Sequence, residues 1–432
     1  MDHLGLDLGT TTISAAVLDA DGRLLCTRTV PGGAAVAGQP WERKQDARGI
    51  EHAALSLLDG LLQEFPDIGC VGLTGQMHGI VYVDAAGQLL SPLYTWQDET
   101  GAQPGPDGKS TAARLTERTG YPLASGYGLV TLACHQAAGC IPDGAAAVCT
   151  IADYLAMRLS GRSAPCLTPS MAASLGLFDG TGFDREAVRR AGLPERLLPE
   201  VSEEAELGGG RLRVFAALGD NQASFLGAGH GRLDAPLVNI GTGSQFSFFT
   251  KERLTVPGLE TRPFPGGWLL TGAPLCGGRS FALLERFFRQ TAELVTGTPC
   301  PSAYPAMLRA LEAPMPDDVP QFRTTFAGTR QDPAERAVLS GLDEENFAPV
   351  PLLHALLRGM ADELSACYRA ALKAGCAPAG RLLGSGNGLR RNPALQRAVE
   401  RSFGLPLTLA AVPEEAACGA ALFTRMQHEA AL

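Results

Sequence analysis

Two stretches of the chain share one pattern of apolar and polar positions. Residues 4–30 read as an apolar strand, a turn of glycine and threonine, and further apolar strand, with a hairpin turn at residues 19–22. Residues 235–254 repeat the order of strand, glycine- and hydroxyl-rich turn, and strand. This weak self-similarity predicts two domains that are built on related sheets.

Strand patterns alternate with helical patterns along the rest of the chain. Apolar spacing predicts helices over residues 49–65 and 351–375, an amphipathic helix over 150–162, and strands within 68–84. This alternation indicates an α/β fold. With the boundary near residue 230, the predicted domains are residues 1–230 and 231–432.

Composition narrows the range of partners. The 432 residues carry a net charge of −9, which argues against nucleic acid or an anionic membrane as a partner, because both require a basic surface. The 11 cysteines form no C-x-x-C pair and favour buried thiols in a reducing compartment. No apolar run reaches the about 20 residues that cross a bilayer, so we expect a cytoplasmic protein.

Two acidic residues stand beside glycines at predicted strand ends, Asp7 and Asp220. Asp7 allows two interpretations: a strand end that faces water, or a carboxylate that is delivered to a bound cation. The chain also has hydroxyl-rich turns at 9–12 and 241–244 and a glycine loop at 384–388. Together these features supply what phosphoryl transfer needs, namely a magnesium site, backbone groups that hold phosphate, and a base.

Two other nucleotide-binding motifs fit the sequence less well. The run GSGNG at 384–388 is G-x-G-x-G rather than the G-x-G-x-x-G of a dinucleotide fold, and no clear ribose-binding acid follows about 20 residues later. It is either a nucleotide-contacting turn of another kind or a structural turn. The run DGKS at 107–110 is not a P-loop, because Gln103 stands where the first glycine is required.

Taken in order, these segments resemble the superfamily of sugar kinases, actin and heat-shock chaperones, and within it the FGGY family of carbohydrate kinases. LGLDLGTTTISAAVLD is similar to the family's first phosphate motif, NIGTGSQFSF to the second, and LLGSGNGLRRNPALQ to the adenosine motif. The small-residue helix EEAACGAALF also matches in position. The resemblance implies two actin-like, ribonuclease H-like ATPase domains with an active-site cleft between them.

The resemblance also implies roles for individual residues in a kinase that uses ATP and Mg²⁺. Asp220 is the expected general base, and Asp7 is the acid expected to orient Mg²⁺. The residues expected to contact phosphates are Gly9, Thr10, Thr11, Gly241, Thr242 and Gly243. Those expected around the nucleotide are Gly384, Ser385, Gly386, Asn387 and Asn392. Those expected to bind the sugar are Gln76, Met77, His78, Trp96, Asp98 and Asn221.

Within the family, GLTGQMHGIVYVD, TWQD and AASLGLFD resemble segments of sedoheptulokinases, and the first of them also resembles xylulokinases. The expected reaction is phosphorylation of a ketose primary hydroxyl, with sedoheptulose ahead of xylulose, another pentulose or a polyol. Two departures from the family bear on the choice of sugar. Thr168 and Pro169 replace a common Ser-Asp, and Gly328, Thr329 and Arg330 replace a usual Gly-Glu-Arg.

Two further expectations follow from the resemblance. Dimers are common among such kinases, so a homodimer is an expected state. A sugar or nucleotide sensor on the same scaffold is the less favoured alternative to an enzyme, because both acids and both phosphate turns are present.

Overall fold

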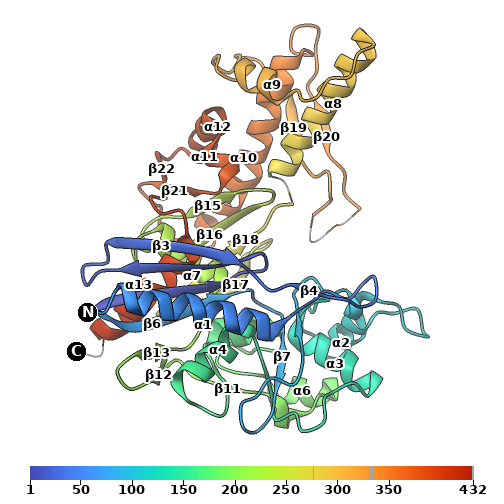
Figure 1. Ribbon diagram of the computed structural model, residues 1–432. Coiled ribbons are helices and arrows are strands. Elements are labelled where there is room, and N and C mark those ends of the chain that lie inside the picture. Colours follow the sequence, from blue (N-terminus) through green and yellow to red (C-terminus); the bar gives the residue numbers. More distant parts are fainter. Residues whose placement is uncertain (276, 330–331, 333, 431–432) are drawn as a thin grey trace. The chain divides into compact units, whose positions relative to one another are not determined.

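The computed structural model describes residues 1–275, 277–329, 332 and 334–430 (Figure 1). Contacts along the chain divide it into two units. Unit 1 comprises Met1–Gly231, Pro263–Pro265 and the segment from Val412 onward, and unit 2 comprises Arg232–Arg262 and Gly266–Ala411. The division near residue 231 lies close to the predicted boundary, but the C-terminal segment differs from the prediction, because it packs within unit 1.

Unit 1 is a mixed α/β unit. Its strands are β1 (Asp2–Leu8), β2 (Thr12–Leu18), β3 (Leu24–Pro31), β4 (Ala35–Val36), β5 (Lys44–Gln45), β6 (Ile68–Gly75), β7 (Val81–Val83), β8 (Leu93–Tyr94), β9 (Ala147–Cys149), β10 (Cys166–Leu167), β11 (Glu200–Val201), β12 (Glu206–Gly208), β13 (Arg213–Phe215) and β14 (Leu218–Gly219). Its α-helices are α1 (Ala47–Glu64), α2 (Thr111–Thr119), α3 (Gly128–Ala138), α4 (Ile151–Ser160), α5 (Pro169–Leu175), α6 (Arg185–Ala191), α7 (Asp220–Ala228) and α13 (Glu415–Ala430).

Unit 2 has the same kinds of element. Its strands are β15 (Leu237–Ile240), β16 (Ser244–Thr250), β17 (Glu260–Phe264), β18 (Gly267–Gly272), β19 (Gln321–Arg323), β20 (Val338–Ser340), β21 (Leu382–Ser385) and β22 (Leu407–Leu409). Its α-helices are α8 (Gly278–Thr296), α9 (Tyr304–Ala310), α10 (Pro349–Lys373), α11 (Asn387–Arg390) and α12 (Pro393–Phe403).

The main sheets of the two units follow one topology, as the repeated sequence pattern predicts. In unit 1, β1 pairs antiparallel with β2 and parallel with β6, and β2 pairs antiparallel with β3. In unit 2, β15 pairs antiparallel with β16 and parallel with β21, and β16 pairs antiparallel with β18. The full orders are β12-β13-β6-β1-β2-β3, with β14 also on β6, and β17-β18-β16-β15-β21-β22.

Helices cover both faces of the unit 1 sheet, and glycines decide how closely they approach. A Cβ on Gly5 or Gly72 would lie 1.9 Å and 2.3 Å from backbone oxygens of α13, so α13 packs directly on the backbone of β1 and β6. Because alternate residues of a strand point to opposite faces, Leu4 and Leu6 face the other side, where they join the core formed with α1 and α4. The small residues of EEAACGAALF therefore let this helix pack closely on the sheet.

Most predicted elements agree with the observed ones. The hairpin turn between β2 and β3 is present, with Gly22 in the left-handed conformation at φ 82°. The predicted helices correspond to α1 and α10, and every described cysteine is a free thiol. The expectation of an amphipathic helix at 150–162 is wrong in one respect, because Ile151 to Met157 are all buried in α4. Among the described helices, none has the length and apolarity that a membrane span requires.

A buried acid near the start of α4 gives the first prediction. Asp153 is fully buried; its Oδ2 accepts a 2.7 Å hydrogen bond from Thr150, and its Oδ1 has no partner. Burial raises the pKa of Asp153 from 3.8 to about 7. Between those values the folded carboxyl keeps its proton while the unfolded one ionises, so its contribution to the free energy of unfolding falls as pH rises.

We therefore expect the Tm of Asp153→Asn to exceed that of the wild type by a few °C at about pH 8 and to differ little from it at about pH 5. Thermal unfolding of both proteins across this range measures the difference. A Tm difference that does not change with pH would contradict the assignment.

Candidate functional site

Three parallel strands of unit 1 end at one edge of its sheet. The register aligns Asp7 of β1 with Thr74 of β6, and Thr74 with Leu218 of β14. The segments that follow these strands are therefore neighbours: the turn at 9–11, the turn at 76–79, and α7, which begins at Asp220. Nine sequence-predicted residues from three parts of the chain lie on these strands and segments: Asp7, Gly9, Thr10, Thr11, Gln76, Met77, His78, Asp220 and Asn221.

Asp7 lies on the face of the sheet that α7 and α13 cover. It is two residues from Gly5 on the same strand, so both residues point to that face. Its nearest acidic neighbours are Asp220, the first residue of α7, and Glu414, which immediately precedes α13. Burial is the largest cause that raises the pKa of Asp7, and together with the charges of Asp220 and Glu414 it brings that pKa to about 7.

Buried polar atoms without hydrogen-bond partners are concentrated at this edge. They are Asp7 Oδ1, Thr74 Oγ1, Gln76 Oε1 and Gln222 Oε1, four of the nine such atoms in the described part of the chain. A buried polar atom without a partner costs on the order of 1–3 kcal/mol, so folded proteins rarely keep several together. A polar or charged ligand at this edge would supply the partners that these atoms lack.

The predicted phosphate turn at Gly9, Thr10 and Thr11 is fixed by two side chains from elsewhere in unit 1. Gln45 donates from Nε2 to the Thr10 carbonyl at 2.7 Å, and Trp96 donates from Nε1 to the Thr10 hydroxyl at 3.0 Å. The Trp96 side chain is 46% exposed, which leaves ring surface open to a ligand.

The predicted sugar turn is linked to the phosphate turn and to β14. Gln76 is buried and donates to Gln45 Oε1 at 2.9 Å, so Gln45 joins the two turns. A Cβ on Gly219, the residue before Asp220, would lie 2.9 Å from Met77 Sδ. His78 adopts a left-handed backbone at φ 72°, and its ring stacks on Tyr127 at 4.7 Å between centroids.

The remaining two sugar-site predictions have different surroundings. Asn221 is buried on α7, and its N–H donates to Asp220 Oδ1 at 2.6 Å. Asp98 is also buried, but its two oxygens accept from the backbone N–H groups of Arg43 and Thr100, each at 3.0 Å. Asp98 therefore stabilises a turn.

Unit 2 contains a pocket of about 620 Å³. Its lining combines the predicted Gly241, Thr242 and Asn387 and Gly388 of the glycine loop with Gly278, Arg279, Ala282 and Arg391, which were not among the predicted site residues. The 19-residue α8 begins at Gly278, and its first two N–H groups donate to the carbonyls of Gly241 at 2.8 Å and Thr242 at 3.0 Å, so the helix holds the glycine turn in place. The helix dipole and the charges of Arg279 and Arg391 favour an anion at this end. The pocket has the size and charge for a nucleotide.

The glycine turns around this pocket differ in what surrounds them. A Cβ on Gly241 or Gly243 would meet no atom within 4 Å, so the turn is open on that side. A Cβ on Gly386 would lie 2.5 Å from the Ile240 carbonyl oxygen, and one on Gly384 would lie 2.6 Å from Leu389. These two glycines are therefore required by packing within the unit.

The other two nucleotide-side predictions have structural partners. Ser385 is buried, and its hydroxyl accepts from Asn239 at 2.8 Å. Asn392 caps α12 by accepting from the N–H of Leu395 at 3.1 Å. Neither lines the pocket.

The positions at which the sequence departs from the family also have defined surroundings. Thr168 is buried and caps α5, with Pro169 at the first position of the helix. Gly328 and Thr329 line a second pocket of unit 2, of about 310 Å³. Arg330 lies outside the described residues.

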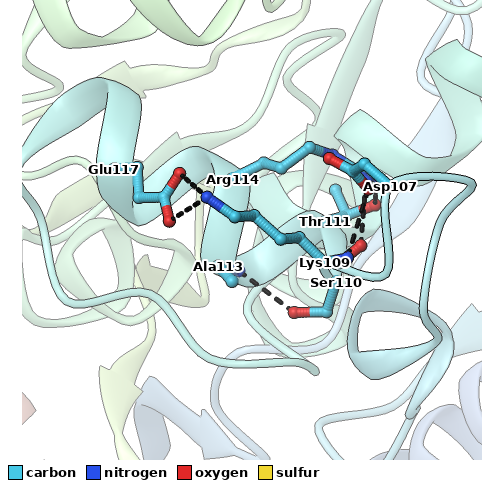
Figure 2. Close-up of polar contacts among 7 residues, drawn as sticks. All are labelled: Asp107, Lys109, Ser110, Thr111, Ala113, Arg114 and Glu117. Carbon is cyan, nitrogen blue, oxygen red and sulfur yellow. Dashed lines mark hydrogen bonds and ion pairs between the residues drawn. The ribbon is translucent and has the colours of Figure 1, made fainter.

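The DGKS run is a capped surface loop, in agreement with its rejection as a P-loop (Figure 2). Lys109 pairs with Glu117 at 2.8 Å, and Arg114 pairs with Asp107 at 2.8 Å. Ser110 caps α2 by accepting from the N–H of Ala113. These polar side chains therefore bind one another.

Comparisons with known proteins agree with this combination of fold and site. Residues 3–234 match the N-terminal domain, and residues 237–428 the C-terminal domain, of the FGGY family of carbohydrate kinases. The chain belongs to this family and is a carbohydrate kinase. FGGY kinases use ATP as the phosphoryl donor.

Individual relatives cover nearly the whole chain. Sedoheptulokinase from Mus musculus is 29% identical over 97% of this chain and 96% of its own length. Xylulose kinase from Streptomyces coelicolor is 26% identical over 97% of this chain and 86% of its own. The crystal structure of xylulose kinase from Rhodospirillum rubrum superposes on this chain with a TM-score of 0.82. The match covers 99% of this chain and 90% of the crystallised chain at 22% sequence identity, so it shows that the two proteins share a fold.

Proposed function

We propose that this kinase transfers the γ-phosphoryl group of ATP to a ketose primary hydroxyl, forming sedoheptulose 7-phosphate from sedoheptulose. Two relatives that match over nearly their whole length, from mouse and human, are named sedoheptulokinase. Xylulose is the alternative substrate, because several xylulose kinases are also among the relatives.

One observation carries the proposal: the cluster of unpartnered buried polar atoms where β1, β6 and β14 end. Gln76 Oε1 belongs to the turn expected to bind the sugar, and Asp7 Oδ1 belongs to the strand that precedes the phosphate turn. Met77 packs against Gly219, so the sugar turn is directly beside the residue that precedes Asp220. This neighbourhood supports a site in which a sugar hydroxyl lies beside an acid.

In the proposed reaction Asp220 acts as the general base. The hydroxyl oxygen forms a bond to the γ-phosphorus while the bond from that phosphorus to the β–γ bridging oxygen breaks, and ADP leaves with that oxygen. The hydroxyl proton passes to the Asp220 carboxylate. Because the transition state of phosphoryl transfer is loose, proton transfer comes late and the position of Asp220 matters more than its basicity.

The residues around Asp7 fit a magnesium ion. Asp7 Oδ1 is buried without a partner, and the charges of Asp220 and Glu414 nearby make a cation favourable. Among the described residues no group of three or more His, Cys, Asp or Glu could hold a metal by itself, and Mg²⁺ needs only one or two carboxylates when phosphates and water complete its shell. We propose that Asp7 holds Mg²⁺, which would neutralise charge on the phosphates.

We assign the nucleotide to the pocket of about 620 Å³ in unit 2. Thr242 would offer backbone and hydroxyl donors on the open side of the glycine turn, where the Gly241 N–H already donates to the Gly243 carbonyl at 2.9 Å. Arg279 and Arg391 would offer charge. Asn387 is the remaining predicted residue that lines the pocket.

A panel of sugars tests the substrate. With ATP and Mg²⁺ present, we expect kcat/KM to be highest for sedoheptulose. Its kcat/KM should exceed those of xylulose and ribulose by about tenfold, which corresponds to about 1.4 kcal/mol, and should exceed that of glycerol by more. Coupled detection of ADP gives the values. A higher kcat/KM for xylulose would favour the alternative substrate, and ketose binding without any turnover would favour the sensor.

Asp220→Asn tests the base. Because the asparagine keeps the shape but cannot accept the proton, we expect kcat to fall by about 100-fold or more, with the Kd for ATP unchanged. Asp153→Asn is the matched control, since it removes a buried carboxylate outside the site and should leave kcat unchanged. Normal turnover in Asp220→Asn would refute the assignment.

Arg391→Ala tests the nucleotide pocket. We expect the Kd for ATP to rise by about tenfold, because a charged hydrogen-bond donor is lost, while the sugar still binds normally. Isothermal titration with ATP and with the sugar separately measures both. Arg390→Ala is the control, since the neighbouring arginine does not line the pocket. Equal effects of the two substitutions would contradict the assignment.

A further inference from the structure

The short helix α5 makes hydrogen bonds to the backbone just before Asp220. Thr168 and Ser170, both buried, lie in its first turn, and their hydroxyl oxygens are 2.8 Å apart. Thr168 donates to the Ala217 carbonyl at 2.7 Å, and the N–H of Gly219 donates to Ser170 Oγ at 3.1 Å. The two hydroxyls therefore bridge both ends of the three residues that precede Asp220.

The direction of these bonds follows from chemistry. A backbone N–H can only donate and a carbonyl can only accept, and each hydroxyl has one proton. Proton donation therefore runs from Gly219 N–H to Ser170, from Ser170 to Thr168, and from Thr168 to the Ala217 carbonyl. Loss of one hydroxyl leaves a buried partner unsatisfied, so the geometry of this segment depends on both.

The last turn of the same helix makes two hydrogen bonds to the sugar turn. Ser174 Oγ accepts from the N–H of His78 at 3.2 Å, and the Ser174 carbonyl lies 2.6 Å from His78 Nδ1. Since a carbonyl can only accept, Nδ1 carries the proton and Nε2 is the acceptor nitrogen of the neutral ring. Ser174 thereby fixes the tautomer of His78 and its left-handed backbone at φ 72°.

We propose that α5 is a positioning element of the kinase: Thr168 and Ser170 set the position of Asp220, and Ser174 sets that of His78, so that the sugar hydroxyl and the base meet at reacting distance. The inference rests on the proposed function, because it takes Asp220 as the base and His78 as a sugar contact. At position 168 the family's common Ser and the Thr168 of this chain both carry a hydroxyl, and here its partner is the Ala217 carbonyl.

Single substitutions separate the two ends of the helix. We expect Ser170→Ala and Thr168→Val to lower kcat by about 10- to 100-fold with the KM for the sugar nearly unchanged, because a shift of about 1 Å in a reacting group has effects of this size. Thr168→Ser keeps the hydroxyl, so its kcat should match that of the wild type. Ser174→Ala should instead raise the KM for the sugar, by about tenfold, with a smaller change in kcat. The Kd for ATP should not change in any of them.

Ser91→Ala is the matched control. Ser91 also accepts from a backbone N–H, that of Tyr82 at 3.0 Å, and donates to a backbone carbonyl, that of Pro92 at 2.8 Å. If the α5 hydroxyls only stabilise the fold, all the variants including Ser91→Ala will lose activity in proportion to their loss of Tm, with no division between kcat and KM. That result, or unchanged kinetics, would overturn the proposal.

Hydrogen exchange separates failure of this inference from failure of the proposed function. Ser170→Ala should speed exchange in residues 217–220, and Ser174→Ala should speed exchange in residues 76–79, each by about tenfold. If the wild type phosphorylates no sugar, the proposed function fails, and these exchange rates still decide whether α5 holds the two segments. Unchanged exchange in both variants would refute the positioning role.

Discussion

The structure of unit 1 depends on contact between the backbones of α7 and α13. A Cβ on Gly419 would lie 1.8 Å from the carbonyl oxygen of Ala223, and one on Gly227 would lie 1.9 Å from that of Glu415. No other residue type has a small enough side chain for this approach. Because α7 begins at Asp220, the glycine contact fixes the direction of the helix that carries the proposed base. Its N-terminus is then fixed separately, by β6 through β14 and by the hydroxyls of α5.

The edge of the unit 1 sheet where β1, β6 and β14 end keeps polar groups at a cost in stability. Asp7, Thr74 and Gln76 keep buried polar atoms without partners, which is unfavourable for the protein alone. Gln45 in the same unit shows the contrast, because its side chain uses both its oxygen and its nitrogen between the two turns. The unsatisfied groups lie where the proposed sugar and metal sites would supply their partners.

Local patterns were enough to predict the strands, the hairpin at residues 19–22, α1, α10 and the repeated sheet, because these depend on apolar periodicity and turn residues. The roles expected of Asp7 and Asp220 followed from the family resemblance, whereas the parallel pairing of β1, β6 and β14 that makes their segments neighbours came from the structure. Contacts between distant segments could not be predicted: Gln45, Glu414 and Ser170 act on residues far along the chain.

Asp98 and Asn392 show the converse difficulty, since a side chain suited to a ligand can equally cap a turn or a helix. Arg391 was readable in principle, because basic residues directly follow the glycine loop.

The return of the C-terminal segment to unit 1 has a consequence for biosynthesis. The ribosome makes β1 and β6 early, but α13 covers their glycine face only after the whole of unit 2 has been translated. Unit 2 is encoded almost without interruption, so it can fold while the first sheet still exposes that face. Unit 2 can therefore be complete before α13 covers the first sheet, and a truncation before Val412 would leave unit 2 whole and the glycine face of the first sheet uncovered.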